Sequence, residues 1–181
     1  MDKAEFRKRI KQLKKSYNFL KAQHEADVVF DLLKSLRAYK EAKNILLYYA
    51  MPDELPTAKF INEEFGKKAI FLPRISGNDL ELVKYTGDLR QNDKFNVLEP
   101  SGSELASLTD IQLAVVPGVA FDKHCNRLGR GKGYYDKLLE ANNVFKIGVA
   151  FDFQFKDEIP TTDNDIKMNA VLTPSHIVFH H

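Results

Sequence analysis

Residues 127–136 read RLGRGKGYYD, and the types and spacing of these residues fit the binding of phosphate groups. Three glycines alternate with two cations: Gly129, Arg130, Gly131, Lys132 and Gly133. Glycine lets the backbone approach a ligand closely, and backbone N–H groups with cations beside them hold phosphate in many proteins. A flexible turn with two surface cations is the alternative interpretation. The pattern matches neither the P-loop nor G-x-G-x-x-G.

The residues on either side of this loop carry further chemistry. Arg127 either binds an anion or anchors the turn by pairing with Asp122. Tyr134 and Tyr135 belong either to a ligand pocket or to the core. Asp136 falls in the first turn of a predicted helix, where a carboxylate is favourable because it interacts with the helix N-terminus.

Hydrophobic periodicity predicts the elements that must position the loop. Steps of three and four between apolar residues predict helices, over residues 3–22, 25–40, 57–66 and 133–142. Short apolar or alternating runs predict strands, over residues 44–50, 68–75, 79–86, 111–121, 144–151, 169–173 and 176–179. The Gly-, Asn- and Ser-rich stretch 87–108 is predicted to be mostly loop. Strands alternating with helices predict a mainly parallel sheet covered on both faces, in one domain over residues 1–181.

Composition and charge exclude several classes of protein. With 44% hydrophobic and 29% charged residues and no long apolar run, the chain is predicted to be a globular protein without a membrane helix. The charged start of the chain predicts no signal peptide, and the single cysteine, Cys125, suits a reducing cytoplasm. Residues 1–43 hold 12 Lys and Arg against 6 Asp and Glu, although the net charge is only +2. This excess is either a solvated helix face or an arm directed at an anion.

The segment VVPGVAFDKHCNRLGRGKGYYDKLL (115–139) resembles the signature of the 5-formyltetrahydrofolate cyclo-ligase family, also called methenyltetrahydrofolate synthetase. Weaker resemblances follow in the family's order, in KAEFR (3–7), YYAMPDELPT (48–57), FLPRI (71–75), LEP (98–100), FDFQF (151–155) and IPTTDNDIKMNAVLT (159–173). The resemblance implies a three-layer α/β/α sandwich. It also implies conversion of 5-formyltetrahydrofolate to 5,10-methenyltetrahydrofolate with ATP and Mg²⁺, by a monomer that binds small molecules and neither nucleic acid nor membrane.

The resemblance also implies roles for individual residues. It makes Arg130 and Lys132 catalytic and assigns ATP contacts to eleven residues, namely Lys3, Arg7, Arg127, Leu128, Gly129, Arg130, Gly131, Lys132, Gly133, Tyr134 and Tyr135. It assigns folate contacts to Tyr49, Glu54, Arg130 and Tyr134, and a Mg²⁺ site to Asp136 and Asp165. From the residues alone, the alternative interpretation is that Lys3 and Arg7 are solvated cations on one helix face and that Glu54 is a surface charge.

The chain departs from the family pattern at Cys125, where glycine is usual, and at Thr162, Asn164 and Asn169 near the implied metal segment. Two other kinds of function stay open from the sequence. One is a non-catalytic anion- or RNA-binding module that uses the basic N-terminal helix, and the other is an isomerase or transferase of phosphorylated small molecules on a related fold. Cys125, His180 and His181 are given no catalytic or metal-binding role.

Overall fold

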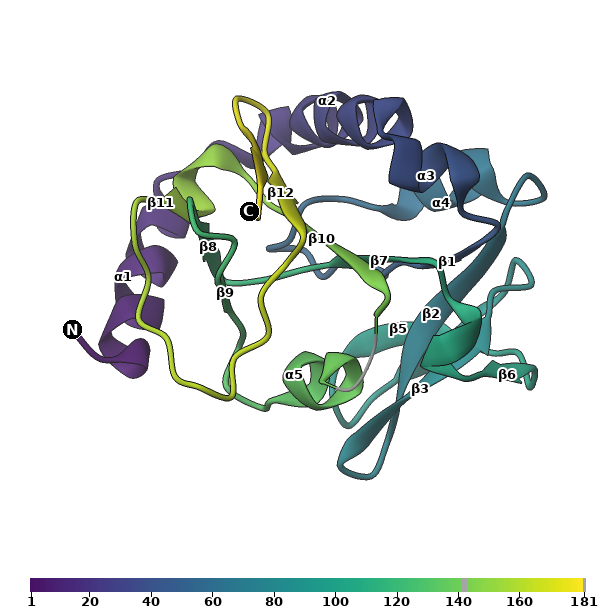
Figure 1. The fold of residues 1–181 in the computed structure, drawn as a ribbon. Helices are drawn as coiled ribbons and strands as arrows, with labels where there is room; N and C mark the ends of the chain where they lie inside the picture. The colour runs from purple at the N-terminus through teal and green to yellow at the C-terminus, as the bar shows by residue number, and fades with distance from the viewer. Residues whose placement is uncertain (141–142, 181) are drawn as a thin grey trace.

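A computed structural model describes residues 1–140 and 143–180 of the chain. The last two residues of the predicted helix 133–142, and the terminal His181, lie outside the described residues. Eight strands form the main sheet in the order β13-β12-β10-β7-β1-β2-β3-β6 (Figure 1). They are β1 (Asn44–Leu46), β2 (Ala69–Ser76), β3 (Asp79–Lys84), β6 (Leu105–Ala106), β7 (Leu113–Val116), β10 (Phe145–Val149), β12 (Ala170–Leu172) and β13 (Ile177–Phe179).

The centre of this sheet is parallel, because β12, β10, β7, β1 and β2 pair in one direction while β13, β3 and β6 join antiparallel at the edges. Successive side chains of a strand point to opposite faces, so each central strand supplies two cores. In β7, for example, Leu113 and Val115 join one core, whereas Ala114 and Val116 join the other.

Helices cover both faces of the sheet. Figure 1 shows α2, α3 and α4 on one side, α5 on the other, and α1 at the end where the N-terminus lies. Their bounds are α1 (Lys3–Lys15), α2 (Ala22–Ser35), α3 (Arg37–Glu41), α4 (Ala58–Glu64) and α5 (Tyr134–Leu139). Short 3-10 turns lie at Phe19–Lys21, Leu108–Asp110 and Asp152–Gln154. The predicted three-layer α/β/α fold with a mainly parallel sheet is confirmed.

The prediction that residues 87–108 are mostly loop misses three short strands. This stretch holds a hairpin of β4 (Leu89–Asn92) and β5 (Val97–Pro100), followed by β6. The hairpin's polar turn and its short strands hide the alternation that predicts a strand. A second small sheet, β11-β8-β9, is built from β8 (Ala120–Asp122), β9 (Arg127–Leu128) and β11 (Phe155–Lys156), and it leads into the glycine loop.

The predicted helix 3–22 is also wrong in its length, because α1 ends at Lys15. The chain turns there so that the Tyr17 ring packs against Phe151 and Phe153, with ring centroids 4.7 and 5.0 Å away. Leu20, which completes the apolar spacing in the sequence, is 93% exposed. The predicted helix 25–40 is likewise two helices, α2 and α3, separated by an extended residue at Leu36.

Two apolar runs that the sequence assigns to long strands form short ones. The run 44–50 pairs only over β1, and the run 111–121 divides into β7 and β8 around Pro117 and Gly118. Proline lacks the N–H that a ladder needs, so the chain leaves the sheet at this point. β1 and β7 are parallel neighbours, so their carboxyl ends open onto the same edge of the sheet.

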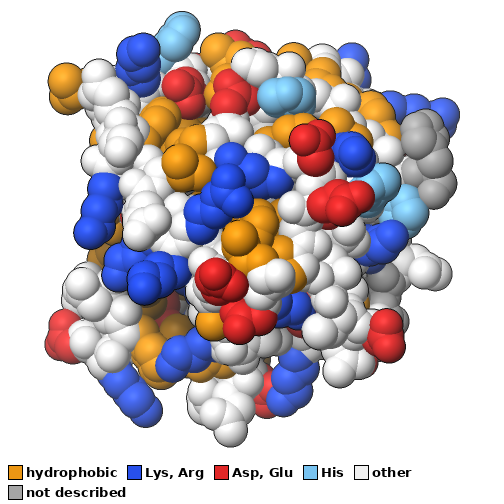
Figure 2. Space-filling view, turned by 90° about the vertical axis from the view of Figure 1, so that its left-hand side faces the viewer, with side chains coloured by type: hydrophobic (Ala, Val, Ile, Leu, Met, Phe, Trp, Pro, Cys, Tyr) orange, Lys and Arg blue, Asp and Glu red, His pale blue; other side chains and the backbone are white. Residues whose placement is uncertain are grey.

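The face of the molecule on which α1 lies carries many charged side chains. Figure 2 shows Lys and Arg on this face interspersed with Asp and Glu. Nucleic-acid-binding faces are usually basic throughout, with aromatic side chains within the basic patch.

Within residues 1–140 and 143–180, none of the helices combines the length and the apolar character that crossing a bilayer requires.

Candidate active site

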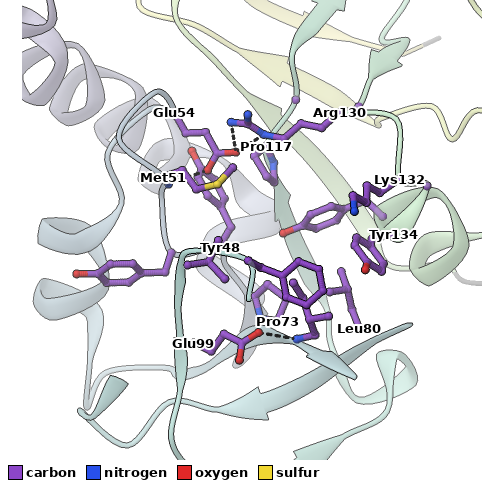
Figure 3. Close-up of a pocket in the computed structure, with 18 of the residues that line it drawn as sticks. Tyr48, Met51, Glu54, Pro73, Leu80, Glu99, Pro117, Arg130, Lys132 and Tyr134 are labelled. Atoms are coloured by element: carbon purple, nitrogen blue, oxygen red, sulfur yellow. Dashed lines mark hydrogen bonds and ion pairs between the residues drawn. The ribbon is translucent and has the colours of Figure 1, made fainter. Parts of the chain in front are cut away.

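A cavity of about 260 Å³ opens at the carboxyl ends of β1 and β7, beside the glycine loop (Figure 3). Four parts of the chain surround it, and each contributes lining residues. These are Tyr48, Tyr49, Met51 and Glu54 after β1; Pro73, Ile75 and Leu80 from β2 and β3; Phe95, Val97, Leu98 and Glu99 from the β4–β5 hairpin; and Pro117, Gly118, Arg127, Gly129, Arg130, Lys132, Gly133, Tyr134, Tyr135 and Asp136 around the glycine loop. One side of the cavity is therefore cationic and another is apolar.

The glycine loop needs glycine at two positions. Gly131 has φ +101° and Gly133 has φ +70°, which are left-handed conformations that strain other residues. Gly133 is the N-cap of α5 and offers no side chain to the first-turn N–H groups. α5 has only six residues, so its dipole is small. We therefore attribute the positive potential of the loop mainly to its Arg and Lys side chains.

Arg127 lies beneath the loop, with only 6% of its side chain exposed. Its Nε donates to the Pro117 carbonyl at 2.9 Å and its Nη1 contacts the Asp136 carboxylate at 3.3 Å, while its guanidinium lies over the Tyr135 ring. Burial lowers the pKa of Arg127. The alternative in which Arg127 pairs with Asp122 is wrong, because that carboxylate accepts from local backbone N–H groups and the Asn126 amide.

Arg130 extends from the loop toward the segment that follows β1. Its guanidinium contacts Asp53 at 2.7 Å and Glu54 at 3.0 Å, and Asp53 also contacts Lys14 of α1 at 2.6 Å. Burial alone would raise the pKa of Asp53, but hydrogen bonds from Arg130 and Lys14 outweigh burial and lower this pKa to about 2. These ion pairs bring Arg130 and Glu54, which are 76 positions apart in the sequence, to one end of the cavity.

Lys132 stands on the opposite side of the loop from this acidic pair. Its ammonium lies 5.7 Å from the centre of the Phe95 ring in the β4–β5 turn. No carboxylate pairs with Lys132 among residues 1–140 and 143–180, so its charge is available to an anion.

The two N-terminal cations do not line the cavity, and they contact different parts of the chain. Arg7 donates from Nε to the Gly129 carbonyl at 2.7 Å, and its guanidinium lies beside Gly131, where an added Cβ would sit 3.5 Å from Arg7 Cζ. Lys3 pairs with Asp165 at 2.6 Å and donates to Thr162 Oγ1 at 2.9 Å. α1 is thus attached to the glycine loop at one point and to the C-terminal segment at another.

The two carboxylates implied as metal ligands are both engaged by cations. Asp136 pairs with Arg127, and Asp165 pairs with Lys3. Burial lowers the pKa of Arg127, and Asp165 lies close enough for its negative charge to oppose part of that lowering. Within the described ranges, no group of three or more His, Cys, Asp or Glu side chains could hold a metal ion by itself. A Mg²⁺ ion here would need oxygens from a ligand, and phosphate oxygens commonly supply them.

Among the expected ligand contacts, four further residues line the cavity: Tyr49, Glu54, Tyr134 and Tyr135. Leu128 does not line it, because its side chain is buried against α1 and its carbonyl accepts from Val119 at 2.7 Å. The side chain of Leu128 is therefore a core residue. Burial raises the pKa of Tyr135, so its hydroxyl stays protonated near neutral pH.

The apolar side of the cavity was missed by sequence reasoning. Pro73, Ile75 and Leu80 form part of this side, and Phe95 and Leu98 of the unpredicted hairpin form another part. Glu99 is 3% exposed and accepts from the Ile75 N–H at 2.9 Å, which attaches the hairpin to β2 (Figure 3). The segments FLPRI and LEP, in which Pro73, Ile75 and Glu99 lie, gave a signal only through their resemblance to the family.

Comparisons with known proteins identify the family to which the chain belongs. Residues 1–174 match the model of the 5-formyltetrahydrofolate cyclo-ligase family. A probable 5-formyltetrahydrofolate cyclo-ligase of Schizosaccharomyces pombe is 33% identical over 79% of this chain and 80% of the relative. The Haemophilus influenzae 5-formyltetrahydrofolate cyclo-ligase is 31% identical over 83% of this chain and 86% of the relative. The solved structure of Aquifex aeolicus 5,10-methenyltetrahydrofolate synthetase superposes with a TM-score of 0.89 at 31% identity, covering 99% of this chain and 93% of that one.

Proposed function

The chain belongs to the 5-formyltetrahydrofolate cyclo-ligase family, and from that premise we propose that the cavity beside the glycine loop is where its reaction takes place. The protein is an enzyme that converts 5-formyltetrahydrofolate to 5,10-methenyltetrahydrofolate with ATP. The formyl oxygen attacks the γ-phosphoryl group and ADP leaves. N10 then attacks the formyl carbon, its proton is released, and phosphate leaves as the ring closes.

One observation carries the assignment of the site: a single cavity joins the cationic glycine loop to an apolar surface. The reaction needs both surfaces, since a triphosphate and the fused ring system of a reduced pterin must meet there. An amide oxygen is a weak nucleophile, so its alignment with the phosphoryl group determines much of the rate. Arg130 of the loop contacts Glu54, and Lys132 of the same loop lies beside Phe95 of the apolar side.

The folate occupies the apolar side in this proposal. Its ring lies between Tyr134 of α5 and the residues that follow β1, which include Tyr49. Glu54 accepts N–H groups of the pterin, as a carboxylate does well. This carboxylate is already oriented, since its Oε2 accepts from the Met51 N–H at 2.9 Å.

The triphosphate lies along the glycine loop. Gly129, Gly131 and Gly133 let the backbone approach it, and Arg130 and Lys132 neutralise its charge. α1 contributes through Arg7, which supports the loop at Gly129, and through Lys3. The basic N-terminal helix and the rest of the chain thus act as one cyclo-ligase domain over residues 1–181, and in this proposal the enzyme is a monomer of the cytoplasm.

Asp136 and Asp165 would hold Mg²⁺ by exchanging their present cationic partners for the ion. Two carboxylates with phosphate oxygens and water are a usual ligand set for Mg²⁺, so these residues fit it. When bound, the ion would offset the charge on the phosphate oxygens. Asp136 keeps part of its side chain exposed, at 25%, which leaves room for a further ligand.

The two loop cations take different parts in the reaction. The planar fork of Arg130 suits the oxygens of the transferred phosphoryl group, where charge is redistributed in the transition state. Lys132 is a point charge with no carboxylate partner among the described residues, so it mainly holds the bound nucleotide. Removing a contact that forms only in the transition state lowers kcat. Removing a contact that is equally strong in the substrate complex and the transition state raises KM.

Steady-state kinetics of Arg130→Ala and Lys132→Ala, with ATP varied at saturating folate, test this assignment. We expect Arg130→Ala to lower kcat by roughly 10²-fold or more. Lys132→Ala should mainly raise KM for ATP. If Arg130→Ala changes only KM while Lys132→Ala loses kcat, the two roles are reversed.

A further inference from the structure

A chain of ion pairs links α1, the segment after β1 and the glycine loop. Lys14 contacts Asp53 at 2.6 Å, Asp53 contacts Arg130 at 2.7 Å, and Arg130 contacts Glu54 at 3.0 Å. Asp53 is therefore shared between two cations, and Arg130 between two carboxylates. The expected ligand contacts include Arg130 and Glu54 but assign nothing to Lys14 or Asp53.

The two carboxylates occupy different edges of the Arg130 guanidinium. Asp53 contacts the edge formed by the two terminal nitrogens, with Nη1 at 3.3 Å from Oδ2 and Nη2 at 2.7 Å from Oδ1. Glu54 takes the side edge, with Nε at 3.3 Å and Nη2 at 3.0 Å from the same Oε1. The paired N–H groups of the guanidinium are what bind a phosphate group in two places at once. Asp53 therefore occupies one of the two edges that a phosphoryl group could use, and Glu54 occupies the other.

The two carboxylates also differ in how firmly they are held. The Glu54 side chain is 11% exposed and its second oxygen accepts from the Met51 N–H. The Asp53 side chain is 36% exposed, and its remaining partner is Lys14. An arriving phosphate would thus displace Asp53 more easily than Glu54. Asp53 would not be left unpaired, because its Oδ2 stays beside the Lys14 ammonium.

We propose that Asp53 is a positioning residue that competes with the nucleotide for Arg130, and that Lys14 is the partner to which Asp53 transfers when the nucleotide binds. The inference rests on the proposed contact between Arg130 and the ATP phosphates. Before binding, Asp53 holds the guanidinium extended over the cavity. After binding, the Lys14–Asp53 pair holds the displaced carboxylate and keeps α1 against the segment after β1.

This exchange predicts opposite effects for two substitutions within one ion pair. Asp53→Asn removes the competing charge and should tighten ATP binding. Lys14→Met removes the alternative partner, leaves Asp53 entirely to Arg130, and should weaken ATP binding. We expect each change to be about two- to fivefold in Kd, the size that partly exposed ion pairs usually give. If the pair served only to dock α1, both substitutions would weaken binding.

The test is calorimetric titration of the whole protein with ATP and Mg²⁺, with the melting temperature of each variant measured in parallel. Asp27 of α2 and Lys59 of α4 form a matched ion pair at 2.8 Å that does not line the cavity. Asp27→Asn and Lys59→Met carry the same charge changes and should leave Kd for ATP unchanged. Asp53→Ser and Lys14→Gln repeat the comparison if either first variant folds poorly.

A tighter Kd for Asp53→Asn together with a weaker Kd for Lys14→Met supports the exchange. Changes in the same direction, or equal changes in the control pair, overturn it while the proposed function stands. Wild-type protein that binds no ATP, or an Arg130→Ala variant that binds ATP as tightly as wild type, would instead overturn the assigned role of Arg130 and the inference with it.

Discussion

Replacing Arg127 tests whether the glycine loop is supported from beneath by a buried cation. Arg127→Met keeps most of the side-chain length but removes the donor to the Pro117 carbonyl and the partner of Asp136. A buried acceptor left without a donor costs about 1–3 kcal/mol. The Asp136 side chain is 25% exposed, so its carboxylate partly regains water, and loss of the ion pair with Arg127 adds about 1 kcal/mol or less. We therefore expect a loss of roughly 3 kcal/mol in the free energy of unfolding.

For a chain of this length, each kcal/mol changes Tm by about 2–4 °C, so Arg127→Met should melt roughly 6–12 °C below wild type. Differential scanning calorimetry measures this shift. Arg37→Met is the control, because Arg37 forms an exposed i,i+4 pair with Glu41, and it should melt close to wild type. An unchanged Tm in Arg127→Met together with lost ATP binding would refute the supporting role and make Arg127 a direct nucleotide contact.

Three other buried or paired groups give measurable expectations. Gly148→Ala should lower Tm markedly, because the added Cβ would lie 2.4 Å from the fully buried Phe121 ring. Overpacking of this kind costs about 1–3 kcal/mol or more in the free energy of unfolding. A melting temperature equal to that of wild type would contradict the packing. Burial raises the pKa of the Cys125 thiol to about 11. Iodoacetamide at pH 7.5 should therefore modify this thiol far more slowly in native protein than in protein unfolded by urea. Equal rates would place the thiol at the surface. The ion pairs of Asp53 lower its pKa from 3.8 to about 2, so they stabilise the fold above pH 4, and this stabilisation is lost as pH falls from about 4 to 2. Asp53→Asn should therefore flatten the acid-unfolding curve in that window. An unchanged curve would count against the pairing with Arg130.

Much of the architecture could be predicted from the sequence because local signals and tertiary packing agree there. The apolar runs at β7 and β10 lie at the centre of the sheet and are buried on both faces, and the glycine loop does precede a helix. The errors arise where packing overrides periodicity. Tyr17 extends the apolar spacing of α1, yet its ring packs against Phe151 and Phe153 after the helix has ended.

The site was only partly predictable, because several of its contacts depend on pairings that no sequence spacing encodes. Arg130 and Asp53 are 77 positions apart, and Lys3 and Asp165 are 162 apart. The glycine usual in the family at position 125 has a local explanation, since Cys125 has φ +61°, a conformation that glycine adopts without strain. At another departure, Thr162 accepts a hydrogen bond from Lys3.

The central claim is that this chain uses ATP to close the folate ring at the cavity beside the glycine loop. The most direct measurement follows near-ultraviolet absorbance of the methenyl product after wild-type protein is mixed with 5-formyltetrahydrofolate, ATP and Mg²⁺. We predict product only when both substrates are present, a stoichiometric release of ADP, and a rate at least roughly 10²-fold lower for Arg130→Ala. Failure of folded wild-type protein to form product, or equal rates with and without ATP, would contradict the account.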